Sequence, residues 1–382
     1  MKIGKTNQRD LSLVTTAVFI ATFKAQGLPE IIQYAIQVSM LIVVALYFIV
    51  VKRQIYIKDI SLLFSFAMVL STVIAYYKGT VAIGGLLNCT FYAVCMFFMS
   101  QVIRLWFKIG KGKELFKVLL RVVSVYCLIT CASVIMQGVE NSEVVMYFFG
   151  GKFISSYFFI FMLSLVYSVH YERIQKSYKS KVRYLVLCML TAGFLLYFKC
   201  MTAVIMVILI YALAFVPDRV KRILQSRTTV CICIIASGVV LYVLEFVLSL
   251  PIVRTIIVDV MGKSLDLTSR MPIYTVYLIP LITKSFALGY GHSSAILHTF
   301  TPYWNAQNGL AEILLNYGVV GLVLFLLTAW FCTKKRNSGN ADWGCYLMLY
   351  AFVFAAVIEI SYDYFFLTTL FVLWNMNQFE HK

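Results

Sequence analysis

Charged residues are scarce in this chain of 382 residues: they make up only 13% of it, while hydrophobic residues make up 62%. Soluble globular proteins average about a quarter charged and about half apolar residues. Apolar runs of about 18 or more residues recur from end to end, and each is long enough to cross a hydrocarbon core of roughly 30 Å as a helix. The composition therefore excludes an ordinary soluble protein and predicts an all-α integral membrane protein, with one polytopic domain over residues 1–382.

Other features are missing as well. The ten cysteines lie almost entirely inside apolar runs, which favours small buried hydrophobes over disulfides or a metal site. No His/Asp ligand set and no Cys, Ser or Asp cluster is present, so we expect no metal, no cofactor and no covalent intermediate. No internal repeat of the kind that builds transporter halves is visible. The first apolar run ends in "FKAQGLPE", which lacks a small-residue cleavage site and predicts a retained helix.

The apolar runs predict about twelve membrane helices, with one long connection of nearly 60 residues between the ninth and the tenth. This connection, residues 251–308, is apolar and aromatic, so we expect it to fold on the membrane as short amphipathic or re-entrant helices. The predicted spans are 11–27, 31–51, 59–77, 82–104, 117–138, 153–170, 184–199, 202–216, 229–250, 309–332, 343–361 and 363–378.

The basic residues predict the orientation of these spans. The net charge of +17 does not indicate nucleic-acid binding, because most of the 33 lysines and arginines lie in alternate short loops, as the positive-inside rule requires. Both termini are therefore predicted to be cytoplasmic, and the long connection to lie outside. Eight basic residues remain on the outer side: Lys24, Lys78, Lys152, Lys199, Arg254, Lys263, Arg270 and Lys284.

The outward basic residues of the long connection are candidate substrate-binding groups. Arg270 is the strongest, because the planar guanidinium fork suits phosphate oxygens, and Arg254 and Lys284 accompany it. Lys152 follows Gly150 and Gly151 at the predicted start of the sixth span, where a helix N-terminus favours anions. The alternatives are headgroup-binding arginines and a lysine that reaches up to the membrane interface.

The stretch "NAQNGLAEILLNYGVVGL", residues 305–322, places polar groups at the mouth of the tenth span. Asn305 is the predicted N-cap, Gln307 and Asn308 fall in the first turn, and Glu312 lies one turn below Asn308. Such groups in a membrane helix normally face protein or a water-filled cavity. Glu312 either lines such a cavity or forms an ion pair with an outward Arg or Lys.

Two further pairs belong to this region. His292 and His298 precede the stretch and can transfer protons near neutral pH, although an interfacial histidine with no catalytic role is the more common case. Gly318 and Gly321 are spaced for close contact between helices.

These residues resemble a known family, the O-antigen ligase and O-antigen polymerase (Wzy-type) superfamily. Its signature, His followed by Asn, Ser or Gln, then nine residues and Gly-x-x-Gly, is similar to Gln307-Asn308 followed by "GVVGL" at 318–322. Upstream, "TSRMPIYTVYLIPLITKSFALGYG" is similar to the family's Arg, short helix and Gly-x-Gly. "FFGGKFISSYFFIFML" resembles its glycine-rich segment.

The resemblance implies a metal-independent, inverting membrane glycosyltransferase of GT-C-like fold, acting on undecaprenyl-pyrophosphate-linked oligosaccharides at the outer face of a bacterial cytoplasmic membrane. Arg270 would hold the pyrophosphate. The family's histidine is Gln307 here, which cannot act as a base, so Glu312, His298 and His292 are the candidates in that order. Asn308, Lys152, Arg254, Lys284 and His292 are assigned to substrate binding.

The expected activity is polymerisation of repeat units into a capsule, exopolysaccharide or O-antigen. Membrane lipids, a flippase and a chain-length regulator are the expected partners, and nucleic acid is not. A ligase with another acceptor, a polysaccharide transporter or flippase, and a non-catalytic descendant remain open as alternatives.

Overall fold

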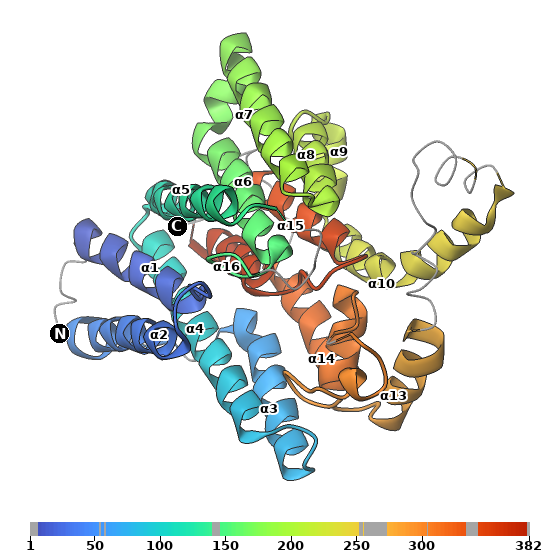
Figure 1. The fold of residues 1–382 in the computed structure, drawn as a ribbon. Helices are drawn as coiled ribbons and strands as arrows, with labels where there is room; N and C mark the ends of the chain where they lie inside the picture. The colour runs from blue at the N-terminus through green and yellow to red at the C-terminus, as the bar shows by residue number, and fades with distance from the viewer. Residues whose placement is uncertain are drawn as a thin grey trace.

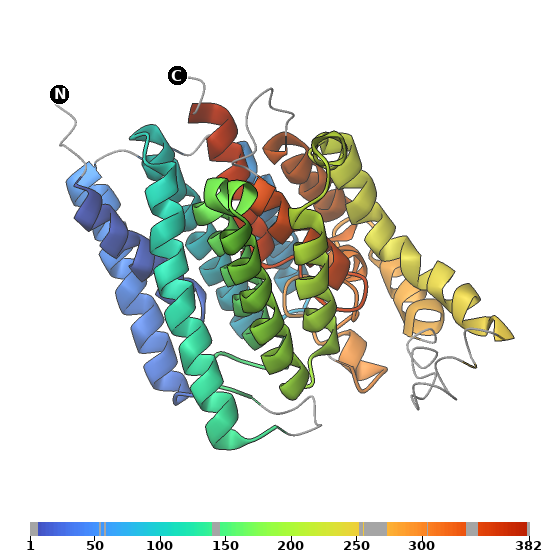
Figure 2. The same ribbon diagram turned by 90° about the horizontal axis from the view of Figure 1, so that it is seen from above.

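A computed structural model of the protein describes residues 7–52, 55–56, 59–139, 146–251, 255, 273–303, 305–333 and 343–379, without the side chains of residues 241–249, 274 and 275. The described residues contain helices and no strand, apart from an isolated bridge between Tyr147 and Gly150. The helices run alongside one another as a bundle (Figures 1 and 2). The predicted all-α class is thereby confirmed.

Each of the twelve predicted segments contains a helix, although the ends differ by several residues. The helices are α1 (Gln8–Thr22), α2 (Glu30–Leu46), α3 (Leu63–Tyr77), α4 (Ile83–Lys108), α5 (Gly112–Gln137), α6 (Lys152–Lys176), α7 (Tyr178–Tyr197), α8 (Met201–Ala214), α9 (Asp218–Leu224), α10 (Arg227–Ser249), α13 (Ile279–Lys284), α14 (Gly309–Cys332), α15 (Trp343–Ala355) and α16 (Tyr364–Phe379). A turn of 3-10 helix at Ile60–Leu62 leads into α3, and π-helical turns at Tyr47–Lys52 and Ile273–Leu278 follow α2 and precede α13.

Seven of the described helices are long and apolar enough to cross a membrane, and the count rises to eight if the bent pair α9 and α10 forms one span. The chain bends by 68° between α9 and the first part of α10, residues Arg227–Val240. The chain is therefore a multi-pass membrane protein by the length and composition of its helices. The twelve-span count stays a prediction, because several of the predicted spans are helices of 13 to 16 residues.

The short helices α15 and α16 form the centre of the bundle. All but one residue of α15 and most residues of α16 are buried, and Figure 1 shows the two helices enclosed by the earlier ones. α16 packs against α4 and α14, while α15 packs against α6 and α8. Aromatic rings fill this centre: Phe365 contacts Phe158, Phe161 and Phe352. Helices that are apolar on all sides belong inside the protein, and α15 and α16 fall short as candidate spans because they have only 13 and 16 residues.

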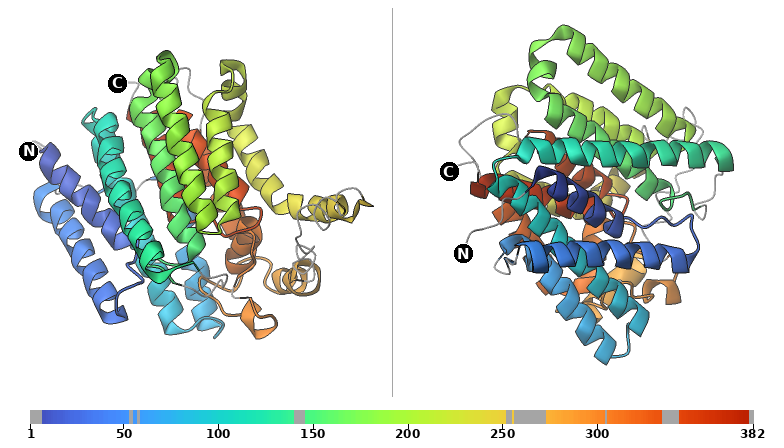
Figure 3. Two further views of the ribbon diagram at one scale, coloured as in Figure 1. Left: turned by 45° about the horizontal axis from the view of Figure 1, so that its top comes forward. Right: turned by 90° about the vertical axis from the view of Figure 1, so that its left-hand side faces the viewer.

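The flanking helices have the opposite character. α1 and α2 lie side by side on one flank (Figure 3), and α2 exposes large apolar side chains such as Ile31, Ile42 and Leu46. α7 does the same with Met189 and Leu190. Exposed apolar residues over a whole helix face are costly in water, whereas they are the rule beside lipid.

The described part of the long connection holds short helical segments, namely the π-turn and α13, and a 3-10 turn at Leu297–Thr299. A small second core, which includes Tyr290, Leu297 and Leu315, joins this region to α14. The connection is thus packed onto the bundle over residues 273–303.

Candidate functional site

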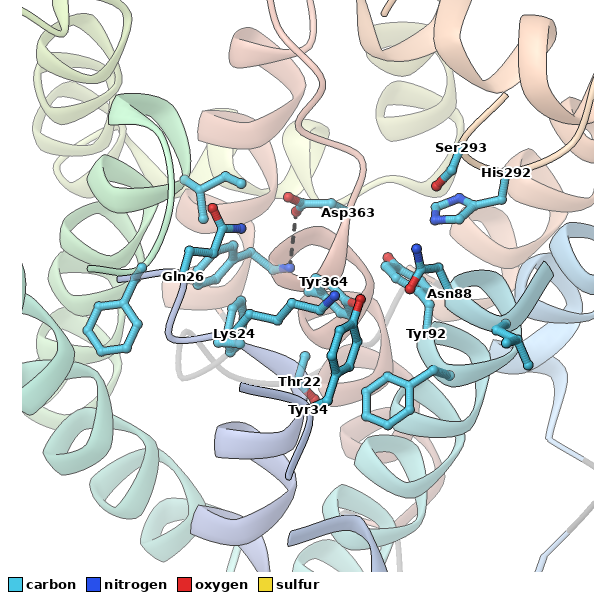
Figure 4. A pocket seen from close by; sticks show the side chains of 16 residues that line it. Thr22, Lys24, Gln26, Tyr34, Asn88, Tyr92, His292, Ser293, Asp363 and Tyr364 are labelled. Atoms are coloured by element: carbon cyan, nitrogen blue, oxygen red, sulfur yellow. Dashed lines mark hydrogen bonds between the residues drawn. The ribbon is translucent and has the colours of Figure 1, made fainter. Parts of the chain in front are cut away.

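A cavity of about 700 Å³ opens at one end of the bundle (Figure 4). Its walls come from segments that are far apart in sequence: the end of α1 and the residues after it, Tyr34 of α2, the first turns of α4, the start of α6, residues 292–293, and the start of α16. Every one of these segments lies at the end of the bundle that the charge distribution predicts to face outward. Polar side chains among the lining residues are Thr22, Lys24, Gln26, Asn88, His292, Ser293 and Asp363.

A smaller cavity of about 200 Å³ adjoins the first one. Both are lined by Tyr92, His292, Ser293 and Asp363, so these four residues stand at the junction. The smaller cavity reaches α14, where Glu312, Asn316 and Tyr317 line it. The expectation that Glu312 lines a cavity is met by this placement.

Glu312 is held by hydrogen bonds at both carboxylate oxygens. Oε2 accepts from the backbone N–H of Ala306 at 2.8 Å, and Oε1 accepts from the Asn316 side-chain amide at 2.7 Å. Asn316 in turn accepts from the Ser294 hydroxyl at 3.2 Å. Glu312 therefore ties the loop before α14 to the helix, and among the described residues its carboxylate contacts amide and backbone donors and no Arg or Lys.

His292 is oriented by two contacts. Its backbone N–H donates to Thr72 Oγ1 at 3.0 Å, and its ring Nδ1 lies 2.6 Å from the Tyr317 hydroxyl. Burial lowers the pKa of His292 to about 4, so the ring is neutral at pH 7. A neutral, fixed imidazole can accept or donate one hydrogen bond toward the cavity.

Asp363 is a site residue that the sequence analysis missed. It caps α16, where one carboxylate oxygen accepts from the Phe365 N–H at 3.3 Å, and Figure 4 shows it at the cavity wall. The side chain is partly exposed and lines both cavities. Burial raises the pKa of Asp363, which stands one residue before α16, to about 7. No ion pair reaches it within the described residues.

The start of α14 differs from the prediction. Asn308, and not Asn305, is the N-cap: its side chain accepts from the Ala311 N–H at 2.9 Å. Gln307 stands before the helix with a left-handed φ of 52°, and Asn305 accepts from the Gln307 N–H at 3.0 Å. The prediction that Gln307 and Asn308 lie in the first turn was therefore wrong, because the Asn305 side chain closes a local turn that competes with the helix.

Asn308 is fully buried and its amide donates to two backbone carbonyls, Ser237 in α10 at 2.9 Å and Val357 at 3.0 Å. It joins three elements and does not line either cavity. Its assigned part in substrate binding finds no support in these contacts.

Gly318 breaks α14, with φ 61° and ψ −166°. Residues 286–291 run beside the break and pair with it. Val319 N–H donates to Phe286 O at 2.8 Å, and Gly291 N–H donates to Asn316 O at 2.7 Å. A Cβ atom on Gly318 would lie 2.4 Å from Ala287 C, and one on Gly289 would lie 2.4 Å from Asn316 C. The close contact predicted for the glycine pair is thus made at Gly318, with a backbone segment and not with another helix.

The other predicted residues lie away from the cavities or outside the described residues. His298 and Lys284 are exposed, at the second 3-10 turn and at the end of α13, and neither lines the two adjoining cavities described above. Lys152 begins α6 as predicted, with its ammonium over the Phe153 ring at 5.3 Å, next to the lining residue Ile154. Arg254 and Arg270 lie outside the described residues.

Lys24 supplies a positive charge to the large cavity that the sequence analysis left unassigned. Figure 4 shows its side chain extending beside Tyr34, and its ammonium lies 4.7 Å from the centre of that ring. Together with Asp363 it gives the cavity one cation and one carboxylate among otherwise neutral polar and aromatic walls. Within the described part of the chain, no group of three His, Cys, Asp or Glu side chains is placed to hold a metal ion.

A third cavity, of about 320 Å³, lies at the other end of the bundle, between α5 and α6. Two of its lysines are paired with carboxylates, Lys113 with Glu172 at 3.4 Å and Lys117 with Glu114 at 2.7 Å. This end carries the basic loops that predict the cytoplasmic side, and its exposed ion pairs are typical of a solvated face.

The fold and the cavity define a multi-pass α-helical membrane protein with a polar cavity at one end of its bundle. Comparison of the chain with protein-family models, curated proteins and solved structures found no match. The likeness to the O-antigen ligase and polymerase superfamily therefore rests on the motif residues.

Proposed function

We propose that this protein is a membrane glycosyltransferase that polymerises oligosaccharide repeat units carried on undecaprenyl pyrophosphate, at the outer face of a bacterial cytoplasmic membrane. One observation carries the proposal. The first and third motif stretches of the resemblance, which are more than a hundred residues apart, line this pair of adjoining cavities, and the residue directly after the second stretch lines both. Phe149 and Ile154 come from the first, His292 follows the Gly-x-Gly of the second, and Glu312 belongs to the third.

The pairing between 286–291 and the break in α14 supports the same reading. It joins the Gly-x-Gly of the second stretch to the Gly-x-x-Gly of the third through backbone hydrogen bonds. Both glycine motifs are then required by geometry, because Gly289 and Gly318 have positive φ and no room for a side chain. A helix break exposes backbone groups, which membrane proteins accept where the backbone lines a cavity or pairs with protein.

The proposed reaction needs little chemical machinery. A hydroxyl of one glycan attacks the anomeric carbon of another, and the lipid pyrophosphate leaves with the electron pair of the broken bond. Cations that neutralise the pyrophosphate, together with positioning, supply most of the rate enhancement in transfers of this kind. Lys24 gives the large cavity one such cation, and Arg270 and Arg254 are proposed for the same task.

Two alternatives share the cavity. A ligase would move a finished glycan to another acceptor by the same chemistry. A transporter or flippase would carry the lipid-linked glycan across the membrane, and the absence of internal repeats in the sequence disfavours it.

The deciding experiment supplies purified protein in liposomes with lipid-linked glycans extracted from the source strain after deletion of this gene. We expect a ladder of longer glycans with release of undecaprenyl pyrophosphate, and no extension with Arg270→Ala at equal protein level. Transfer to an added acceptor without a ladder would favour the ligase, and movement of the lipid-linked glycan between leaflets without bond formation would favour the flippase. Normal polymer length with Arg270→Ala would contradict the arginine's role.

A further inference from the structure

We propose that Asp363 is the general base that takes the proton of the acceptor hydroxyl, a role that rests on the proposed glycosyl transfer. The sequence assigns no function to this residue, and the family histidine, the usual candidate for this task, is Gln307 here. Asp363 is placed at the junction of the two cavities and belongs to the short connection between α15 and α16.

The hydrogen bonds distinguish the Asp363 carboxylate from that of Glu312, the other carboxylate of the site. Glu312 accepts two good hydrogen bonds, at 2.8 Å and 2.7 Å, one at each oxygen. These bonds engage both oxygens and fix the side chain as a link between the loop and α14. Asp363 accepts a long bond of 3.3 Å from the Phe365 N–H and lies near its own backbone N–H, so its carboxylate is held less firmly than that of Glu312 and can face a ligand in the cavity.

His292 is the second competitor, because it lines both cavities. One ring nitrogen is already engaged with the Tyr317 hydroxyl at 2.6 Å. Its surroundings disfavour the charged ring that proton uptake would create, as the lowered pKa indicates. A base must hold the proton it receives, so His292 is better suited to orient a hydroxyl than to deprotonate it.

The groups that face Asp363 set the pH at which it can act. Tyr92 from α4, Tyr157 from α6 and the adjacent Tyr364 surround it, with Lys24 and His292 across the larger cavity and Glu312 across the smaller one. The nearest of these groups are neutral phenols. A carboxylate in such surroundings is a stronger base than one in water, and its raised pKa lies near neutral pH, where a general base is most effective.

The proposed step balances as follows. The acceptor oxygen forms its bond to the anomeric carbon from the face opposite the leaving group. The carbon–oxygen bond to the pyrophosphate breaks and its electron pair stays on the pyrophosphate. The acceptor proton moves to Asp363, which returns it to water when the product leaves.

The test compares Asp363→Asn with the wild type in the liposome polymerisation assay. Asparagine keeps the shape and the N-cap but cannot take the proton. We expect the rate of chain extension to fall by roughly 100-fold or more, while binding of the extracted lipid-linked glycans stays within about threefold. Asp363→Glu should retain part of the rate. Glu359→Gln, a carboxylate change in the same connection but not at the cavity, is the matched control and should extend chains normally.

The pH profile separates a base from a structural residue. The wild-type rate should fall about tenfold per pH unit below the pKa of Asp363, near pH 7, and the residual rate of Asp363→Asn should lack that limb. A folded Asp363→Asn protein with a rate within about threefold of wild type, or with an unchanged acid limb, overturns the assignment. No polymer from the wild type itself overturns the proposed function and, with it, this role.

Discussion

Single polar residues hold the site together more than they line it, and Asn308 is the clearest example. Its buried side chain contacts α10, the connection before α16 and the first turn of α14 through three hydrogen bonds. We expect Asn308→Ala to remove one donor from each of these two backbone carbonyls and the cap from α14, at a cost of roughly 1–3 kcal/mol. Thermal unfolding in detergent measures it, with the exposed Asn88→Ala as the control. Equal unfolding temperatures for the two variants would contradict the structural role.

Asp363 has a stability effect that is separate from its proposed chemistry. Its pKa is about 7 in the folded protein and ordinarily 3.8, so burial disfavours the ionised form. The group thus contributes stability that is fully present below about pH 4 and is lost as the pH rises through 7. We expect Asp363→Asn to unfold at a higher temperature than wild type at pH 8, with the difference shrinking toward pH 5. A variant that is less stable at pH 8 would show that the carboxylate is held more favourably than its contacts indicate.

The residues of the site were predictable only in part. Glu312 was found because a carboxylate near the mouth of an apolar helix needs a polar environment, and it lines the cavity. Asp363 was missed because it is the first residue of the predicted span 363–378, and an acidic residue at the start of a helix is an ordinary N-terminal group. The sequence did carry a signal for this residue. In "SYDYFF" the carboxylate stands among aromatic residues, which disfavours a position in a solvated loop. Gln307 and Asn308 were predicted inside the first turn of α14 but lie before it, because the Asn305 side chain closes a separate turn with the Gln307 N–H.

At the level of elements, the backbone pairing between residues 286–291 and the break in α14 positions His292, Asn316 and Tyr317, which line the smaller cavity. Gly318→Ala places a Cβ atom 2.4 Å from Ala287 C at a positive φ, and Gly289→Ala makes a similar clash with Asn316. We expect each variant to lose polymerisation and to unfold at a lower temperature. The loss in free energy of unfolding should exceed the roughly 1–3 kcal/mol that such strained backbone conformations cost, because the Cβ clash adds to it.

Gly193→Ala in α7 is the matched control for these glycines. Its added Cβ meets nothing within 4 Å, so the change should be neutral or stabilise the helix by up to about 1 kcal/mol. If Gly318→Ala has the same unfolding temperature and polymerisation rate as Gly193→Ala, the helix break is not required for stability or activity.

Patterns of apolar residues predicted where the helices lie, because each run must bury or shield its backbone in a membrane. They could not predict the break at Gly318, since glycine is common in unbroken membrane helices and its backbone angles depend on the partner segment. The ends of α5, α6 and α7 were also misplaced. Each extends into a basic stretch that reads as loop in a hydropathy pattern.

For the whole molecule, the orientation in the membrane is the property to test. The charge distribution predicts that the cavity faces outward, so a cysteine placed at Asn88, on its wall, should react with a membrane-impermeant maleimide in intact cells. A cysteine at the exposed Lys113 should react only after lysis. The unmodified protein sets the background, which should be low because seven of its ten cysteines are buried. The reverse labelling pattern would invert the orientation and contradict an outward site.

The cavity also has a consequence for synthesis. Its walls include Thr22 and Phe365, so no part of it is complete until nearly the whole chain has left the ribosome. At about 5–20 residues per second, that takes roughly 20 to 70 s. Under the proposed function, a half-made chain in the membrane therefore has no complete site for a glycan, and it cannot use the lipid carrier before the last helix is inserted. Premature termination anywhere upstream of residue 363 yields a silent protein instead of a partly active one.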